Sequence, residues 1–184
     1  MGDDWKKTPN KYDSFDKLII TIPTPQILQM HINLSENTKN LLNSVSYDSV
    51  ATLICYSNNI INLEHPKLFE SALFSKIINN SKKYNYKKFS SYVFHTNSEF
   101  ANSINELSKE KIGKKIYKKI EDLIGVNLDE ECYTVPHLWK YGKVKSYLNQ
   151  DFIYENSLGI CGDYFNGNSL ESAYISSTKL SANI

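Results

Sequence analysis

Short apolar and β-branched runs along the chain predict strands. Residues 18–22, "LIITI", form a nearly continuous apolar run, which is typical of a strand buried on both faces in a parallel sheet. Pro23 and Pro25 end this run because proline cannot donate to a strand ladder. Similar patterns predict further strands at residues 46–57, within 72–88, and at 89–96, 130–144 and 158–161.

Helical periods separate these strands. "TPQILQMHI" begins with a Thr-Pro pair suited to a helix N-terminus, and Ser35 is a candidate N-cap for a second short helix. From Asn97 onwards the period changes, and one apolar stripe with lysines opposite predicts an amphipathic helix ending at Gly125. The stripe consists of Ile112, Ile116, Ile120, Leu123 and Ile124.

The order of these elements defines the expected fold. A strand, helices, several strands, a long helix, a strand and a final strand-helix pair predict a mixed β-sheet with helices packed on it. With 184 residues, the chain is long enough for one domain with a hydrophobic core. The expected class is therefore α/β, more narrowly α+β.

Charge gives no reason to expect a nucleic-acid or membrane partner. The formal net charge is +1, and every basic residue is lysine, so the arginine fork that reads guanine edges and phosphate is missing. The basic stretch "KKIYKKI" is interpreted as a solvated helix face because Glu110, Glu121 and Asp122 interleave with its lysines.

Other residue types argue for a cytoplasmic protein without a metal. The start, "MGDDWKKTPNKYD", is too polar for a signal peptide, and no apolar run approaches the length of a membrane span. The sparse cysteines suit reduced thiols, and the histidines lack metal-ligand spacing. These residues are Cys55, Cys132, Cys161, His31, His65, His95 and His137.

The C-terminal stretch carries the candidate chemistry. A predicted strand ends at Gly162-Asp163, where glycine lets a ligand approach the backbone and the carboxylate can accept hydrogen bonds from sugar hydroxyls. Ser169 then caps a helix with small residues near its start, such as Ser172 and Ala173. A helix N-terminus beside a turn suits an anionic or sugar-like ligand, although a tightly packed terminal helix explains the same residues.

This tail resembles the C-terminal flavin-binding motif of the amine-oxidase superfamily, in particular its renalase-like branch. The resemblance lies in Gly162-Asp163 followed by "ESAYISS" at residues 171–177. Blocks in the same order as in the family extend it over nearly the whole chain. These are "FDKLIITIPTPQ", "SVSYDSVATLICYS", "INNSKK", "SYVFHTNSEFA" and "PHLWKY".

The resemblance implies FAD as cofactor and assigns site residues. Asp163, after Gly162, would bind the ribityl or phosphate part of FAD, and the helix start at Glu171, Ser172 and Ala173 would lie against the flavin ring. Pro23 would line the cofactor cleft, and Trp139 the substrate pocket. The implied reaction is oxidation of a small amine or of a reduced nicotinamide-like substrate, with no catalytic residue assigned.

The chain departs from the family pattern in ways that set the remaining expectations. It contains no G-x-G-x-x-G turn for the FAD diphosphate, and its start corresponds to a point well inside a full-length member. Ser172 and Ser177 replace family glycines. The resemblance therefore divides the chain into a substrate-type mixed-sheet domain, residues 1–157, and the strand and helix of an FAD-binding half, residues 158–184, which together are expected to form one compact unit.

Three interpretations stay open. The chain is part of an oxidoreductase completed by a separate N-terminal FAD-binding chain, an inactive remnant of a split gene, or a protein-binding module. Without the nucleotide-binding half, apolar surface along residues 18–22 and around Tyr174 and Leu180 is expected to be exposed. Such surface favours a partner chain or self-association.

Overall fold

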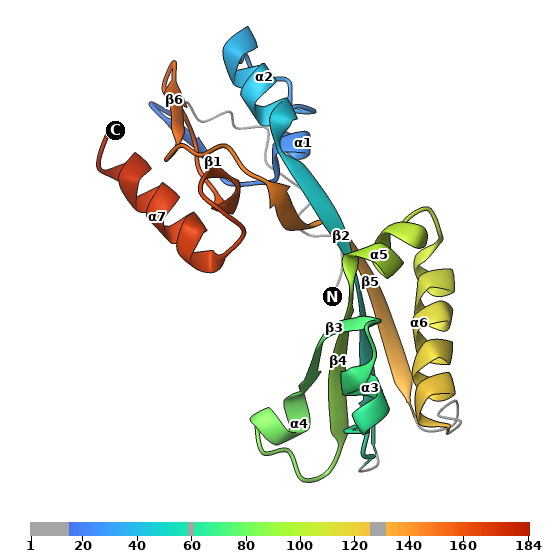
Figure 1. The fold of residues 1–184 in the computed structure, drawn as a ribbon. Helices are drawn as coiled ribbons and strands as arrows, with labels where there is room; N and C mark the ends of the chain where they lie inside the picture. Colours follow the sequence, from blue (N-terminus) through green and yellow to red (C-terminus); the bar gives the residue numbers. More distant parts are fainter. Residues whose placement is uncertain (1–14, 59–60, 126–131) are drawn as a thin grey trace, which may run out of the picture. The chain divides into compact units, whose positions relative to one another are not determined.

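The computed structural model describes residues 15–58, 61–125 and 132–184. They form two compact units, a central unit, Ser46–Lys145, and a terminal unit, Met1–Val45 with Ser146–Ile184 (Figure 1). Helices with mixed and antiparallel sheets make an α+β fold, as the sequence predicts. The first strand pairs with the strand that begins at Leu158. The assignment of residues 1–157 and 158–184 to two halves of a larger protein stays a prediction.

The terminal unit contains a three-stranded sheet with the order β1-β7-β6. β1 (Leu18–Ile20) runs parallel to β7 (Leu158–Ile160), and β6 (Ile153–Glu155) runs antiparallel to β7. The parallel pairing agrees with the sequence pattern. The expected burial of the first strand on both faces is wrong, because β1 is an edge strand in which only Ile20 is buried.

A two-residue turn joins β6 to β7. Asn156 and Ser157 both have positive φ, 49° and 63°, the feature that lets a tight hairpin turn match the twist of its strands. The turn brings Glu155 to the start of α2 (Glu36–Ser44), where its carboxylate accepts hydrogen bonds from Ser35 N–H, Ser35 Oγ and Thr38 Oγ1 at 3.0, 2.7 and 2.9 Å. Burial opposes ionisation of Glu155, but these bonds outweigh it and lower the pKa of Glu155.

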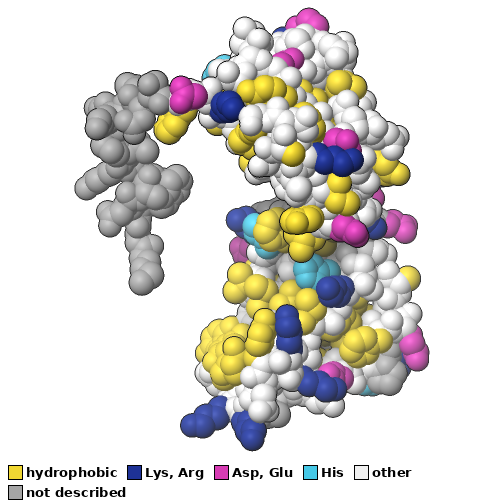
Figure 2. Space-filling view, turned by 90° about the vertical axis from the view of Figure 1, so that its left-hand side faces the viewer, with side chains coloured by type: hydrophobic (Ala, Val, Ile, Leu, Met, Phe, Trp, Pro, Cys, Tyr) yellow, Lys and Arg dark blue, Asp and Glu magenta, His cyan; other side chains and the backbone are white. Residues whose placement is uncertain are grey.

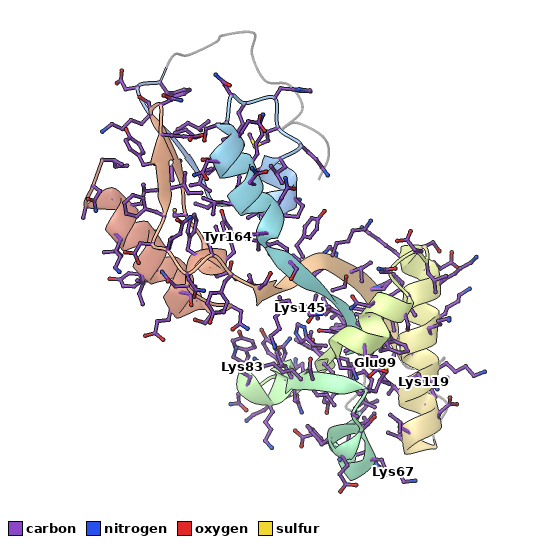
Figure 3. All side chains as sticks on the ribbon, turned by 45° about the horizontal axis from the view of Figure 1, so that its top comes forward. Lys67, Lys83, Glu99, Lys119, Lys145 and Tyr164 are labelled. Atoms are coloured by element: carbon purple, nitrogen blue, oxygen red, sulfur yellow. The ribbon has the colours of Figure 1, made fainter. Side chains whose placement is uncertain are left out.

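Helices lie on both sides of this sheet. α7 (Leu170–Ser181) lies on one side, and α1 (Thr24–Ile27) and α2 lie on the other (Figures 1 and 3). The predicted caps are confirmed: Pro25 lies in the first turn of α1, and Ser35 accepts a hydrogen bond from Thr38 N. Leu180 of α7 is only 1% exposed, so the expectation that it would be exposed is wrong.

The central unit contains a four-stranded sheet with the order β3-β4-β2-β5. Its strands are β2 (Ser46–Ser57), β3 (Phe74–Asn79), β4 (Ser90–Thr96) and β5 (Tyr133–Ser146). β4 runs antiparallel to both β2 and β3, and its residues alternate between buried and half-buried. All four lie where the sequence pattern predicts strands.

Helices complete the core of the central unit. α6 (Lys109–Ile124) buries Ile112, Ile116 and Ile120 against the sheet, and Gly125 ends it at φ 71°, as predicted. The helical pattern that begins after Asn97 is interrupted, because α5 (Ser98–Ser103) forms a separate short helix. Two further short helices, α3 (Pro66–Glu70) and α4 (Asn80–Lys83), were not predicted. None of the helices in the described part of the chain is long and apolar enough to cross a membrane.

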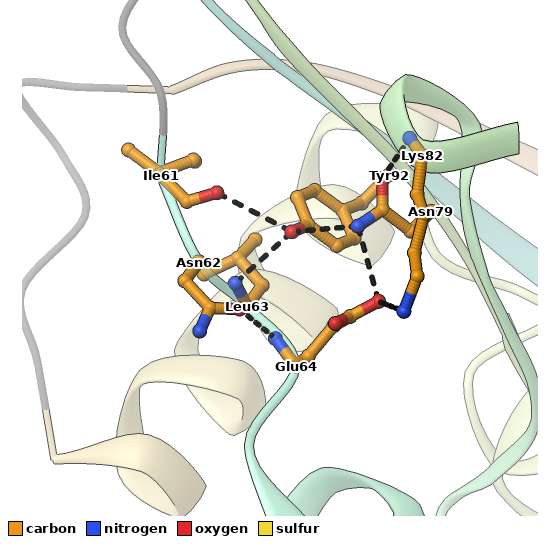
Figure 4. Close-up of polar contacts among 7 residues, drawn as sticks. All are labelled: Ile61, Asn62, Leu63, Glu64, Asn79, Lys82 and Tyr92. Atoms are coloured by element: carbon orange, nitrogen blue, oxygen red, sulfur yellow. Dashed lines mark hydrogen bonds and ion pairs between the residues drawn. The ribbon is translucent and has the colours of Figure 1, made fainter. Parts of the chain in front are cut away.

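The buried Tyr92 of β4 binds the segment before α3 to the sheet through hydrogen bonds (Figure 4). The Tyr92 hydroxyl accepts from Leu63 N–H at 3.3 Å and from Asn79 Nδ2 at 3.1 Å, and donates to Ile61 O at 3.3 Å. Asn79 Nδ2 also donates to Glu64 Oε1 at 3.2 Å. Since Leu63 is buried, its N–H depends on Tyr92 rather than on water.

We expect Tyr92→Phe to lower the free energy of unfolding by about 1 to 2 kcal/mol, because it leaves the buried Leu63 N–H without an acceptor. Urea unfolding followed by circular dichroism measures the change. Tyr133→Phe is the matched control, since Tyr133 is 69% exposed. Equal midpoints for Tyr92→Phe and the unchanged protein would show that the hydroxyl contributes nothing.

Candidate functional site

The Gly162-Asp163 pair lies directly beyond the end of β7. Asp163 begins a short 3₁₀ helix, η2 (Asp163–Phe165), whose Tyr164 and Phe165 are buried. Tyr164, labelled in Figure 3, donates a hydrogen bond from its hydroxyl to Cys161 O at 3.2 Å. The carboxylate of Asp163 therefore extends from a short, well-packed turn.

Gly162 has a packing reason to be glycine. A Cβ atom added there would lie 2.5 Å from Tyr164 Cε1, and the Tyr164 ring is only 1% exposed and so has little room to move. The backbone at Gly162 is extended, with φ 166° and ψ 179°, so its conformation alone does not require glycine. The aromatic ring beneath the turn takes the space that a side chain would need.

The start of α7 is closed by serine hydroxyls. Ser169 Oγ accepts from Ser172 N at 3.1 Å, which confirms the predicted N-cap, and Ala173 N donates to Ser169 O at 3.2 Å. Ser172 is buried, and its hydroxyl lies 3.0 Å from Ser169 Oγ. Ser172 therefore completes the cap of the helix.

Ser176 ties α7 to the turn after β7. This fully buried serine accepts from Gly162 N at 3.2 Å and donates to Asp151 O at 2.6 Å. The Asp151 carboxylate in turn pairs with Lys179 at 2.7 Å, and chiefly the hydrogen bond from Lys179 lowers the pKa of Asp151. These contacts hold α7 beside Gly162.

A pocket of about 380 Å³ lies between the end of β7 and the first turns of α7. Asp163 is its one carboxylate, and no cation is among the lining residues. Burial raises the pKa of Asp163, and hydrogen bonds from the backbone N–H groups of Tyr164 and Asp163 offset the rise only in part. The pocket is lined by Thr21, Cys161, Gly162, Asp163, Leu170, Ala173, Tyr174 and Ser177.

The donor set of this pocket decides which part of FAD fits. A phosphate requires cations or several converging N–H donors, whereas the lining offers the Asp163 carboxylate, the hydroxyl residues Thr21 and Ser177, and apolar walls. A sugar-like hydroxyl can donate to the Asp163 carboxylate, and the apolar side chains of Ala173 and Tyr174 suit the face or edge of a flat ring. The residues therefore fit the ribityl and ring parts of a flavin and do not fit its diphosphate.

Three of the residues expected at the site come together here: Gly162, Asp163 and Ala173 line one pocket. The others lie elsewhere in the described part of the chain. Glu171 is exposed on the first turn of α7, and Pro23 is the N-cap of α1. Trp139 belongs to the central unit, where it is 54% exposed and its ring lies 4.2 Å from that of His137.

Five lining residues were not expected at the site from the sequence: Thr21, Cys161, Leu170, Tyr174 and Ser177. Thr21 reaches it because β1 pairs in parallel with β7, a pairing between segments about 140 residues apart that no local pattern reveals. A signal was available for Tyr174 and Ser177, which follow Leu170 and Ala173 by one helical turn on the same face of α7.

Comparison with known sequences gives no family, since no family model and no curated protein matches the chain. Solved structures do match. A protein described as a protoporphyrinogen oxidase from Exiguobacterium sp. 255-15 superposes with a TM-score of 0.62 and 12% identity, over 91% of this chain and 41% of that chain. Two variants of a putrescine oxidase redesigned in cofactor binding each match with a TM-score of 0.58 and 11% identity, over 90% of this chain and 42% of theirs.

These matches define the fold class. At 11–12% identity the likeness shows that this chain shares the fold of part of these oxidases. This chain spans about two-fifths of the length of the structures that it matches.

Proposed function

We propose that this chain is part of an FAD-dependent oxidoreductase of the amine-oxidase superfamily, of the renalase-like kind, acting in the cytoplasm. The observation that carries the proposal is the pocket in which Gly162, Asp163 and Ala173 meet, in a chain whose fold matches part of two oxidases. The sequence contains only three, widely spaced cysteines, which accords with a reducing compartment.

In this proposal the residues of the terminal unit hold the sugar-like part of the cofactor. The Asp163 carboxylate accepts hydrogen bonds from ribityl hydroxyls, and Ala173 and Tyr174 pack against the ring. The N-terminus of α7 favours negative charge on the ring through its dipole. Bound FAD supplies hydride acceptance from a small amine or a reduced nicotinamide-like substrate, and Trp139 is proposed as a wall of the substrate pocket.

The proposal includes a separate chain that supplies the diphosphate site. Support comes from the uncovered apolar edge of the terminal sheet, where Leu18 and Ile19 are 48% and 42% exposed. Leu170 and Tyr174, at the rim of the pocket, are 89% and 69% exposed. An edge strand without charged side chains favours pairing with another chain, and self-association is the competing outcome.

Two flavins that differ in their side chain test the pocket directly. We expect the purified chain to quench riboflavin fluorescence saturably and to bind riboflavin about tenfold more tightly than lumiflavin, which lacks the ribityl hydroxyls. Equal affinity for both, or no saturable quenching by riboflavin, would overturn the assignment of Asp163 to the ribityl chain.

The completing chain is tested separately. Co-expression with a candidate chain that contains a G-x-G-x-x-G turn is expected to give a yellow complex with flavin absorbance, whereas this chain purified by itself is expected to be colourless. A colourless complex would reject that candidate. Tight FAD binding by this chain alone would contradict the need for a second chain.

A further inference from the structure

Four aromatic rings form a row beside the connection between β3 and β4. The Phe89 ring centroid lies 5.4 Å from that of Tyr56 and 4.5 Å from that of Tyr86, and the Tyr86 centroid lies 5.8 Å from that of Tyr84. The two rings at one end are open to solvent, since Tyr84 is 55% and Tyr86 44% exposed. We call Tyr56, Phe89, Tyr86 and Tyr84 the aromatic row.

Lysines are concentrated in the segment that carries most of the aromatic row. Figure 2 shows lysines beside hydrophobic side chains at the lower end of this face of the molecule. Between Glu70 and Glu99 the sequence has no acidic residue. It has five lysines there, Lys76, Lys82, Lys83, Lys87 and Lys88. The Lys83 ammonium lies 5.0 Å from the Tyr84 ring centroid, and Lys82 pairs with Glu64 at 3.6 Å.

The backbone that carries the row is ordered by its own hydrogen bonds. Ser81 Oγ accepts from Ser91 N at 2.7 Å and donates to Phe89 O at 3.2 Å, and Tyr86 N donates to Ser81 O at 2.8 Å. Asn85 takes a positive φ of 55°, which reverses the chain between the two exposed tyrosines. The rings are therefore held in place before any partner binds, which lowers the entropic cost of binding.

We propose that the aromatic row and its lysines bind single-stranded nucleic acid without sequence preference. Bases stack on Tyr84 and Tyr86, and Lys83, Lys87 and Lys88 contact the phosphates. The net charge of +1 describes the whole chain, whereas the segregation of lysines from acids between Glu70 and Glu99 creates a local excess of positive charge in this segment. The absence of arginine removes the usual base-edge fork, which fits binding without preference.

The side chains of the row favour nucleic acid over an anionic lipid surface. Peripheral binding to lipid relies on exposed Trp, Phe or Leu that enter the apolar layer, with lysines on the polar side. In the aromatic row the most exposed rings are tyrosines with polar hydroxyls, and Phe89 is half-buried between its neighbours. Flat, solvent-facing rings with polar edges suit stacking on bases.

Fluorescence anisotropy of a labelled oligo(dT) of about 20 nucleotides at low salt tests the proposal, because a strand of that length covers a single-strand site. Replacing Lys83, Lys87 and Lys88 together by glutamine is expected to weaken binding about tenfold. It should also reduce the slope of log K against log salt by about 2, since three phosphate contacts are lost. Replacing Tyr84 and Tyr86 by serine is expected to weaken binding at least about thirtyfold with the slope unchanged.

A matched control uses lysines from the other basic stretch. Lys115, Lys118 and Lys119 are exposed on α6 (Lys119 is labelled in Figure 3), and their replacement by glutamine is expected to leave affinity within about twofold. Failure of the unchanged protein to bind oligo(dT), or tighter binding of duplex than of single strand, would overturn the proposal. So would an equal loss of affinity in the control variant, or binding to phosphatidylserine vesicles without binding to oligo(dT).

Discussion

Replacing Gly162 by alanine is expected to lower the free energy of unfolding of the terminal unit by about 2 to 3 kcal/mol. The added methyl group would lie 2.5 Å from the buried Tyr164 ring, and overpacking of this kind forces side chains out of their rotamers. Because Gly162 N also donates to Ser176 Oγ, a shift of the turn loosens α7. Hydrogen exchange of residues 146–184, compared with that of 46–145, measures the loss.

A double-mutant cycle separates packing from other effects of the change. In a Tyr164→Leu background the ring is gone, so Gly162→Ala is expected to cost less than about 1 kcal/mol. An equal cost in both backgrounds would show that something other than the Tyr164 ring selects glycine. Circular dichroism of each variant confirms that the comparison is made between folded proteins.

The second large effect concerns Asp163. Asp163→Asn is expected to weaken riboflavin binding about tenfold at neutral pH, because an ionised acceptor is replaced by a neutral amide oxygen of the same shape. Lumiflavin, which has no ribityl hydroxyls, is expected to bind both proteins equally. Asp16→Asn, on an exposed residue that does not line this pocket, is the matched control.

Although Asp163→Asn is expected to weaken riboflavin binding, it is expected to preserve or raise the stability of the folded chain. Burial raises the pKa of Asp163 above 3.8, so the folded chain holds its proton more tightly than the unfolded chain. Stability therefore falls as pH rises from the unfolded value through the raised one, and the cost persists at neutral pH. Asp163→Asn removes this pH dependence and is expected to unfold at an equal or higher urea concentration than the unchanged protein at pH 7. A lower midpoint would contradict this account.

The elements that sequence could predict are those with local signals. The β-branched runs of β2 and β4 and the lysine-backed stripe of α6 depend on periods of two and 3.6 residues within one segment. Ser35, Ser169 and Gly125 end helices through contacts with residues only a few positions away. Such features need no knowledge of the rest of the chain.

The features that the sequence did not predict correctly depend on neighbours distant in sequence or on weak turn signals. β6 is three residues long, and its turn at Asn156-Ser157 lacks the glycine that usually marks two positive φ values. The apolar run at residues 18–22 is the pattern of a doubly covered strand, but β1 is an edge strand in this structure. Leu180 is buried because it packs over Gly159 of β7, which a helical pattern alone cannot reveal.

The residues of the candidate site also divide into those that a local pattern groups and those that only distant contacts bring together. Gly162, Asp163 and Ala173 lie within twelve residues of one another, so a strand-turn-helix pattern was enough to group them. Thr21 joins them only through the parallel pairing of β1 with β7, and Ser172 could not be placed inside the cap without its bond to Ser169. The Ser172 hydroxyl belongs to the helix cap, and Ser172 does not line the pocket. This serine therefore gives no support to the interpretation of the chain as an inactive remnant.

The pairing of β1 with β7 also sets an order for folding. Its partners, such as Leu18 and Leu158, flank the whole central unit, so forming the terminal sheet from an unfolded chain requires closure of a very long loop. β2 and β5 are neighbours in the central sheet, and Ser146 Oγ donates to Ser44 O at 3.0 Å where the two chain segments leave it. A folded central unit therefore brings the two halves of the terminal unit together. β1 is therefore expected to pair with β7 only after the central unit, about a hundred residues, has folded.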